Sequence, residues 1–91
     1  MNKANKHFDQ NKKVEPEIIR IISEITDIDA ATINLTTDLV KELGLDSFAA
    51  VELQFNLEDF FDIKCSDSEM KQLRTVGDIT KLVQKKFDSK I

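Results

Sequence analysis

The sequence predicts an all-α protein, a small four-helix bundle of three main helices and one short helix, with a long loop between helices one and two. The chain has 91 residues, 41% of them hydrophobic and 33% charged, so it can bury one modest core and fold as one domain. Apolar residues recur at helical spacing in three stretches. Two glycines and one proline are too few for the many turns of a β-sandwich or barrel.

The first thirteen residues are polar and aperiodic, so we expect a flexible basic tail at 1–13 ahead of a helical domain at 14–91. Apolar residues from Val14 onward follow one face of a helix predicted at about 15–28, with Pro16 in its first turn.

Residues 29–46 form a long connection rich in Thr and Asp but also in Leu and Ile, so we expect it to pack on the core rather than hang free. A helical turn at about Asp38–Leu43, closed by Gly44 in a left-handed conformation, would end this packing segment.

A second main helix is predicted at about 47–62, and it carries two apolar stripes. The broad stripe suits a core and consists of Ala50, Leu53, Leu57, Phe60 and Phe61. The narrow stripe lies nearly opposite and consists of Phe48, Val51 and Phe55. Acidic side chains flank this narrow stripe: Glu52, Glu58, Asp59 and Asp62. A half-exposed apolar stripe with an acidic rim is typical of a docking surface.

Two capping sequences open the remaining helices. Ser66–Glu69 reads as a capping box for a short helix ending near Leu73, and Thr75–Asp78 reads as the start of the last helix. The inner side of the last helix is predicted to comprise Val76, Ile79, Leu82, Val83 and Phe87.

Charge is distributed unevenly along the chain. The overall net charge is −4, but residues 1–13 carry +3, residues 14–63 carry −10 and residues 64–91 carry +3. The central acidic block repels phosphate backbones and anionic lipids and attracts basic protein surfaces, so we expect a protein partner.

The sequence lacks the residues that several function classes require, among them disulfide-bonded, membrane-spanning, catalytic and metal-binding proteins. The lone cysteine, Cys65, forms no internal disulfide or zinc motif, and no signal or membrane-spanning segment is seen, so we expect a cytoplasmic protein without membrane insertion. The one histidine, His7, lies in the tail, so no Ser-His or Cys-His pair is expected on the core. An EF-hand-like spacing at Asp27, Asp29 and Asp38 fails, because Ala31 and Thr32 occupy positions that need an oxygen ligand and a glycine. We therefore expect no catalytic residues and no metal site.

The remaining motif is Gly44-Leu45-Asp46-Ser47-Phe48 at the start of the second main helix. Asp-Ser ahead of an apolar helix is most often a helix cap and nothing more. A serine hydroxyl at a helix N-terminus is also a good place for a phosphodiester, because the terminal N–H groups and the helix dipole favour an anion. The hydroxyl has no base of its own, so a visiting enzyme would have to activate it.

The segment from Thr37 to Val83 resembles an acyl carrier protein. The family's G-x-D-S-[L/M] attachment motif corresponds to residues 44–48, and Val51-Glu52-Leu53, the acidic stretch 58–62, the short third helix and Thr75-Val76 fall where the family has them. With the first helix included, the resemblance covers about residues 14–87.

The resemblance implies that Ser47 accepts 4'-phosphopantetheine from coenzyme A through a magnesium-dependent phosphopantetheinyl transferase. The thiol of that arm would hold acyl intermediates as thioesters, in fatty acid, lipid or polyketide-type biosynthesis. Asp46 matches the aspartate that helps position the transferase's metal. The narrow apolar stripe and the acidic rim match the positions that dock on basic surfaces of acyl-transferring and acyl-modifying enzymes, although for each acid a simple solvated helix face is the alternative. In the family an acyl chain can fold back between the helices, and here Leu57, Ile79 and Val83 would line such a space, although residues of this kind are more often plain core.

The chain departs from the family pattern at several positions. Phe48 replaces the usual Leu or Met, Ala49 and Ala50 stand where many fatty-acid carriers have an acid, and Cys65-Ser66 replaces a frequent Ile-Pro. Both ends of the chain are basic. These departures favour a specialised, free-standing carrier that serves a dedicated synthase or ligase. We expect a monomer, since a carrier must present one face to many partners.

Two other functions remain open at this point. One is a helical protein-interaction module of the same shape in which Ser47 is never modified. The other is nucleic-acid binding through the Lys-rich tail, which the neighbouring acidic block disfavours. The sequence does not identify the acyl cargo or the partner enzymes.

Overall fold

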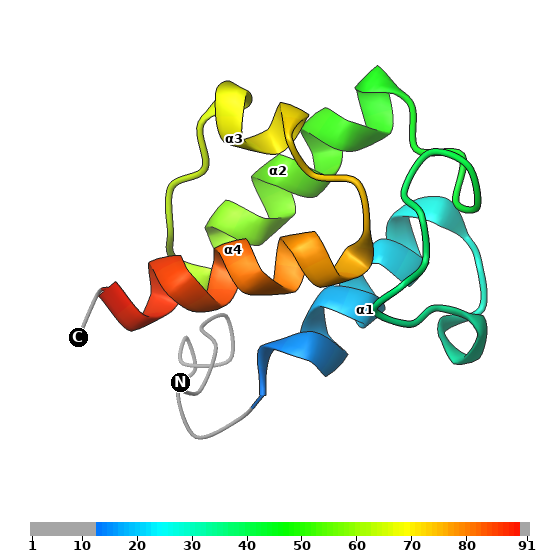
Figure 1. Ribbon diagram of the computed structural model, residues 1–91, viewed down its shortest axis with the longest axis horizontal. Coiled ribbons are helices and arrows are strands. Elements are labelled where there is room, and N and C mark those ends of the chain that lie inside the picture. Colours follow the sequence, from blue (N-terminus) through cyan, green and yellow to red (C-terminus); the bar gives the residue numbers. More distant parts are fainter. Residues whose placement is uncertain (1–12, 90–91) are drawn as a thin grey trace.

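The computed structural model describes residues 13–89, and it is helical with no strand in that range (Figure 1). The elements are α1 (Val14–Thr26), the 3-10 turn η2 (Ala30–Thr32), α2 (Ser47–Phe61), α3 (Asp67–Lys71) and α4 (Val76–Ser89). The predicted fold class is therefore confirmed. The predicted tail lies outside the described residues except for Lys13, and so does His7.

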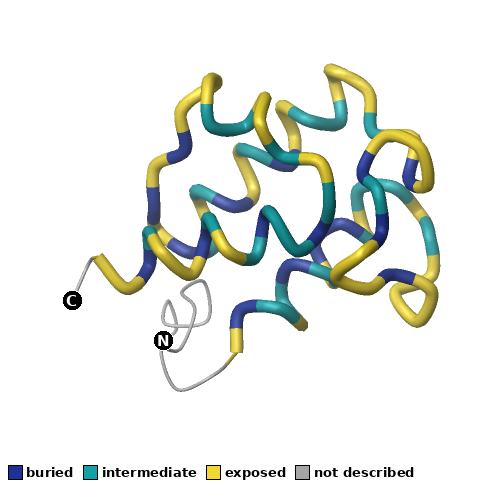
Figure 2. The backbone as a smooth tube through the Cα atoms, in the orientation of Figure 1, coloured by how far each residue is buried: buried dark blue, intermediate teal, exposed yellow. Residues whose placement is uncertain are grey.

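The core lies between the three long helices. α1 packs against both α2 and α4, and α2 also contacts α4, whereas the short α3 lies beside α2 (Figures 1 and 2). The largest fully buried side chains come from all three long helices: Phe61, Ile18, Ile22, Leu53, Leu57, Ile79, Val14, Val76 and Val83. The broad stripe predicted on α2 and the predicted inner side of α4 thus form the core, although Ala50, Phe60 and Leu82 are only half-buried.

Helices α1 and α2 end earlier than the apolar periodicity predicts, α1 by two residues and α2 by one. α1 stops at Thr26 because Asp27 adopts a left-handed conformation (φ 66°), and its N–H donates to the Ser23 carbonyl. α2 stops at Phe61 because Asp62 does the same (φ 56°), with its N–H donating to the Glu58 carbonyl. Apolar periodicity does not register these caps, because Ile28 and Ile63 continue to pack on the core after each helix has ended.

The connection between α1 and α2 is packed, as expected. Ile33, Leu39 and Leu43 are buried. Three backbone hydrogen bonds join the connection to the start of α4: from Leu39 N–H to Arg74 O (2.8 Å), from Val76 N–H to Thr37 O (3.1 Å) and from Gly77 N–H to Leu35 O (2.8 Å). The turn predicted at 38–43 is also present, since the N–H of Glu42 donates to the Asp38 carbonyl at 3.1 Å.

The backbone explains why glycine occupies positions 44 and 77. Gly44 follows the turn with φ +65°, the left-handed region that favours glycine. Gly77 lies where α4 crosses the connection, and a Cβ there would meet the Leu35 carbonyl oxygen at 3.0 Å. A residue with a Cβ would therefore be strained at position 44 by the backbone conformation, and at position 77 by contact with the Leu35 carbonyl oxygen.

Both predicted capping sequences are formed. The Ser66 hydroxyl accepts a hydrogen bond from Glu69 N–H (3.0 Å) while the Glu69 carboxylate accepts one from Ser66 N–H (2.9 Å). Thr75 and Asp78 make the same reciprocal pair at the start of α4. Across residues 13–89, no helix is both long enough and apolar enough to span a bilayer.

Candidate functional site

The motif at 44–48 leads into the N-terminus of α2, where the adjacent residues Asp46 and Ser47 have different roles. Asp46 is the N-cap, and its carboxylate accepts a hydrogen bond from Ala49 N–H at 2.9 Å. Ser47 is the first helical residue and is exposed. The cap predicted for the Asp-Ser pair is therefore present, but the aspartate alone forms it.

The Ser47 hydroxyl makes no hydrogen bond with any of the residues that the structure describes. It projects from the N-terminus of a 15-residue helix with no acidic side chain in its first turn. Unpaired N–H groups and the positive end of the helix dipole favour an anion at such a position. The local chemistry thus fits a phosphodiester on this oxygen.

Two hollows meet at Ser47. The first, of about 220 Å³, lies between the connection, α2 and α3, and its lining is largely apolar: Leu39, Val40, Leu45, Asp46, Ser47, Ala50, Leu53, Met70, Lys71 and Leu73. The second, of about 420 Å³, lies between α2 and α3 and is lined by Ser47, Ala50, Val51, Gln54, Asp67, Met70 and Lys71. A group attached to Ser47 therefore has two adjoining spaces on the same side of the molecule.

Sequence reasoning did not find most of these lining residues. Leu57, Ile79 and Val83, expected to line a space for an acyl chain, are each 0% exposed within the core, and the hollows beside Ser47 are lined by other residues. Met70 and Lys71 reach the site because α3 folds back beside the start of α2, which no local pattern predicts. Asp46, Ser47 and Val51 are the lining residues that the sequence had assigned to the site, and Leu45 also lies inside the motif.

The narrow stripe of α2 is exposed, as predicted. Phe48, Val51 and Phe55 have 79%, 62% and 72% of their surface accessible, so all three are more open than the half-exposure expected. They occupy positions i, i+3 and i+7 of one helix and therefore form one continuous apolar face that starts beside Ser47.

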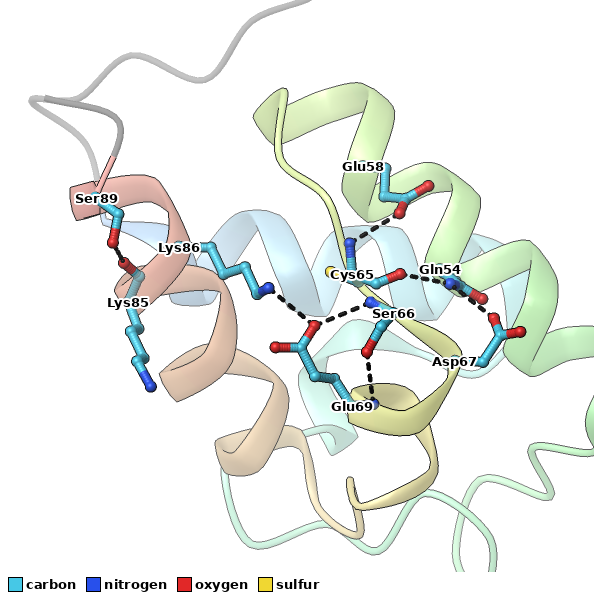
Figure 3. A network of polar contacts seen from close by, with 9 residues as sticks. All are labelled: Gln54, Glu58, Cys65, Ser66, Asp67, Glu69, Lys85, Lys86 and Ser89. Atoms are coloured by element: carbon cyan, nitrogen blue, oxygen red, sulfur yellow. Dashed lines mark hydrogen bonds and ion pairs between the residues drawn. The ribbon is translucent and has the colours of Figure 1, made fainter.

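The acidic rim divides into two kinds of residue. Glu52, Asp59 and Asp62 are exposed. Glu58 is half-buried, and its Oε2 accepts a hydrogen bond from Cys65 N–H at 2.8 Å, which ties the segment after α2 back onto the helix (Figure 3). Glu58 thus has a structural contact that the sequence did not predict.

The segment leading to α3 is held by further polar contacts. Gln54 Nε2 donates to the Cys65 carbonyl (2.7 Å) and to Asp67 Oδ1 (3.3 Å), and Lys86 Nζ lies 2.8 Å from Glu69 Oε1 (Figure 3). The Lys86 ammonium and the Ser66 N–H lower the pKa of Glu69. Burial, followed by the charge of Glu58, raises the pKa of the Cys65 thiol, which favours its neutral form as a packing residue.

No cluster of three or more His, Cys, Asp or Glu side chains within residues 13–89 is placed to hold a metal ion. The site therefore consists of one accessible hydroxyl, two adjoining hollows, and an exposed apolar stripe with acidic neighbours. This combination offers an attachment point and a contact face.

The comparisons with known proteins identify the family of this chain. The family model described as a phosphopantetheine attachment site matches residues 16–83. The chain is 32% identical to an acyl carrier protein of Rhodococcus erythropolis over 81% of each chain. It is 37% identical to the meromycolate extension acyl carrier protein of Mycobacterium tuberculosis, over 75% of this chain and 59% of that protein. The solved acyl carrier protein of Thermotoga maritima superimposes with a TM-score of 0.72 at 30% identity, covering 84% of this chain and 88% of that one. The chain therefore belongs to the acyl carrier protein family, a family of non-catalytic carriers with a covalently attached 4'-phosphopantetheine group.

Proposed function

We propose that Ser47 is the residue that receives 4'-phosphopantetheine from coenzyme A. The observation that carries this proposal is the division of tasks at the start of α2: Asp46 caps the helix, so the exposed Ser47 hydroxyl is left available. The phosphodiester formed on Ser47 Oγ would sit at the positive end of the α2 dipole. The thiol at the end of the arm supplies the chemistry, since it holds acyl groups as thioesters.

The protein's own residues prepare the hydroxyl but do not activate it. No histidine is present among residues 13–89, and Asp46 is engaged with Ala49 N–H. A phosphopantetheinyl transferase must therefore bring the base and the metal, as the family relationship implies. In this proposal Asp46 presents its second carboxylate oxygen toward that metal while its first oxygen caps the helix.

We further infer that the exposed face of α2 docks on the partner enzymes. Phe48, Val51 and Phe55 would bury apolar surface, and Glu52, Asp59 and Asp62 would steer basic partners toward the face. The two features meet at the end of α2 in a hollow of about 230 Å³, lined by Phe55, Glu58, Asp59, Asp62, Ile63 and Lys64, which suits an Arg or Lys side chain. A small apolar contact with charge steering permits fast exchange between enzymes.

The same inferences bear on the biosynthetic pathway that this carrier serves. We place the protein among monomeric, cytoplasmic carriers that serve the biosynthesis of fatty acids, lipids or polyketide-type acyl chains. The name of the meromycolate extension relative supports the lipid alternative. Phe48, Ala49 and Ala50 around the serine support a dedicated synthase or ligase rather than the general fatty-acid enzymes.

The test of attachment is intact-mass analysis after incubation with coenzyme A, magnesium and a broad-specificity phosphopantetheinyl transferase. We expect the wild type to gain one phosphopantetheinyl unit and the Ser47→Ala variant to gain none, with both variants folded by circular dichroism. If the folded wild type gains no mass with a range of transferases, the carrier proposal is wrong and an unmodified interaction module replaces it.

The pathway inference has a separate test. Rates of acyl transfer by the primary fatty-acid ketosynthase and malonyltransferase are compared on this protein and on a housekeeping fatty-acid carrier. We expect slow transfer to this protein. Equally fast transfer by both enzymes would contradict the specialised role while leaving the attachment intact.

A further inference from the structure

Lys71, the last residue of α3, lies at the place where the two hollows beside Ser47 join. Among the residues that line the two hollows, Ser47, Ala50, Met70 and Lys71 are common to both, and Lys71 is the one cation. The sequence motif does not include Lys71, which is exposed. As the basic residue in the last turn of α3 it also interacts favourably with the helix dipole, a role that leaves its ammonium group open to a further anion.

A phosphodiester on Ser47 would add a negative charge next to the Asp46 carboxylate. Two neighbouring anions at a helix start repel each other, and a nearby cation offsets that repulsion. Lys71 makes no ion pair with any residue in the described part of the chain. Its flexible stem and three donors suit a phosphate oxygen.

The neighbouring acids do not compete strongly for Lys71, because they have partners of their own. Glu69 pairs with Lys86 Nζ at 2.8 Å and accepts from Ser66 N–H, and Asp67 accepts from Gln54 Nε2 at 3.3 Å (Figure 3). These same contacts tie α3 to α2 and α4. The ammonium group of Lys71 is thus uncommitted but anchored to a segment with a defined place beside Ser47.

The second hollow also has the size and chemistry of a resting place for the prosthetic arm. It follows α2 from Ser47 to Gln54, which is roughly 10 Å at the helical rise per residue. Ala50, Val51 and Met70 provide apolar surface for the geminal dimethyl group of the pantoyl unit. At the far end Gln54 donates through Nε2 to the protein, which leaves its carbonyl oxygen to accept from an amide of the arm.

We propose that Lys71 pairs with the phosphodiester on Ser47 and thereby holds the prosthetic arm in the hollow between α2 and α3. Lys71 is a positioning residue in this role, not a catalytic one. The inference rests on the proposed attachment at Ser47 and adds to it a docked state of the arm, from which the arm swings out to a partner enzyme.

The test uses the modified protein, verified by intact mass, and records nuclear Overhauser effects between the dimethyl group of the arm and the methyl groups of Ala50 and Met70. Four samples are compared: wild type, Lys71→Gln, Lys71→Arg and Lys85→Gln. Lys85 is an exposed lysine on α4 outside both hollows, so its substitution matches the change in net charge.

We expect the cross-peaks to fall at least about threefold in Lys71→Gln and to persist in Lys71→Arg and Lys85→Gln, because either cation at position 71 binds the phosphate. In the wild type about 1 M salt should weaken them similarly, since it shortens the screening length to about 3 Å. Equal cross-peaks in wild type and Lys71→Gln, or none in the modified wild type, would overturn the role of Lys71 alone. Absence of the mass gain would overturn the attachment and this inference together.

Discussion

The Asp46 carboxylate lies 2.9 Å from the backbone nitrogen of Ala49 and caps α2, one residue before the exposed hydroxyl of Ser47. Under the proposed attachment, stability and modification depend on two different, adjacent residues. An attachment serine that also capped its helix would lose the cap when modified. Here a group on Ser47 Oγ would leave the hydrogen bond between Asp46 and Ala49 N–H in place.

This division predicts opposite behaviour for two alanine variants. Asp46→Ala should lower the free energy of unfolding by about 1 kcal/mol because the cap is lost. Ser47→Ala should change it by less than about 0.5 kcal/mol, since the hydroxyl bonds to none of residues 13–89 and exposed positions rarely contribute more. Urea unfolding of the unmodified proteins measures both. A larger loss in Ser47→Ala than in Asp46→Ala would show that the serine is the cap.

The apolar stripe on α2 predicts a separation of binding from stability. Phe48→Ala and Phe55→Ala should leave the free energy of unfolding within about 0.5 kcal/mol of wild type, because both rings are largely exposed. Phe61→Ala, at a fully buried ring of the same helix, should lower it by about 3–5 kcal/mol.

Two measurements on each variant test this prediction: urea unfolding, and the KM of a phosphopantetheinyl transferase for the variant as its substrate. We expect the KM to rise several-fold for Phe48→Ala and Phe55→Ala. An unchanged KM in both variants would argue that this face does not dock on the transferase.

Glu58 and Asp59 provide a matched pair within the acidic rim. Each alanine substitution removes one negative charge, but only Glu58 accepts the hydrogen bond from Cys65 N–H. Glu58→Ala should therefore lower the free energy of unfolding by about 1 kcal/mol or more, because a charge-assisted hydrogen bond is lost and an amide is left without its partner. Asp59→Ala should stay within about 0.5 kcal/mol. Equal stability of the two variants would contradict a structural role for Glu58.

The contact between Glu69 and Lys86 predicts a pH dependence. The ammonium group and the Ser66 N–H lower the pKa of Glu69 in the folded protein, so folding favours the ionised carboxylate. The resulting stability is complete above the pKa of an unfolded glutamate, about 4.3, and is lost as the pH falls through the lower pKa of the folded state.

The matched variant for this prediction is Glu69→Gln, which keeps the shape and the hydrogen bond to Ser66 N–H but removes the charge. We expect its Tm to lie below that of wild type at neutral pH and the two to converge as the pH falls below the lowered pKa of Glu69 in the folded protein. A Tm difference that is constant over this range would show that the charge contributes nothing.

Because its thiol is buried, we expect Cys65 to react slowly with disulfide reagents. Burial raises the pKa of this thiol and blocks access, so a disulfide reagent at neutral pH should react with the unmodified protein at least about tenfold more slowly than with the denatured protein. After modification one additional thiol should react fast. A fast Cys65 in the folded, unmodified protein would contradict its placement in the core.

The sequence by itself determined the approximate ranges of the helices, the capping sequences that open α3 and α4, and the motif at 44–48. These depend on local spacing: apolar residues every three or four positions, Ser66 and Glu69 three apart, and Asp46-Ser47 ahead of an apolar run. It also predicted that Phe48, Val51 and Phe55 face away from the core, since their stripe is opposite the broader one.

Only the tertiary structure decided which of Asp46 and Ser47 forms the cap, which acid of the rim is tied to the backbone, and which residues surround the serine. The capping atom is set by side-chain geometry at the helix start. The Glu58–Cys65 contact forms where the chain turns back along α2 after that helix ends. The place of Lys71 beside Ser47 arises because α3 then folds back against α2. Such contacts leave no periodic trace in the sequence, because each depends on the path of the chain rather than on neighbouring residues.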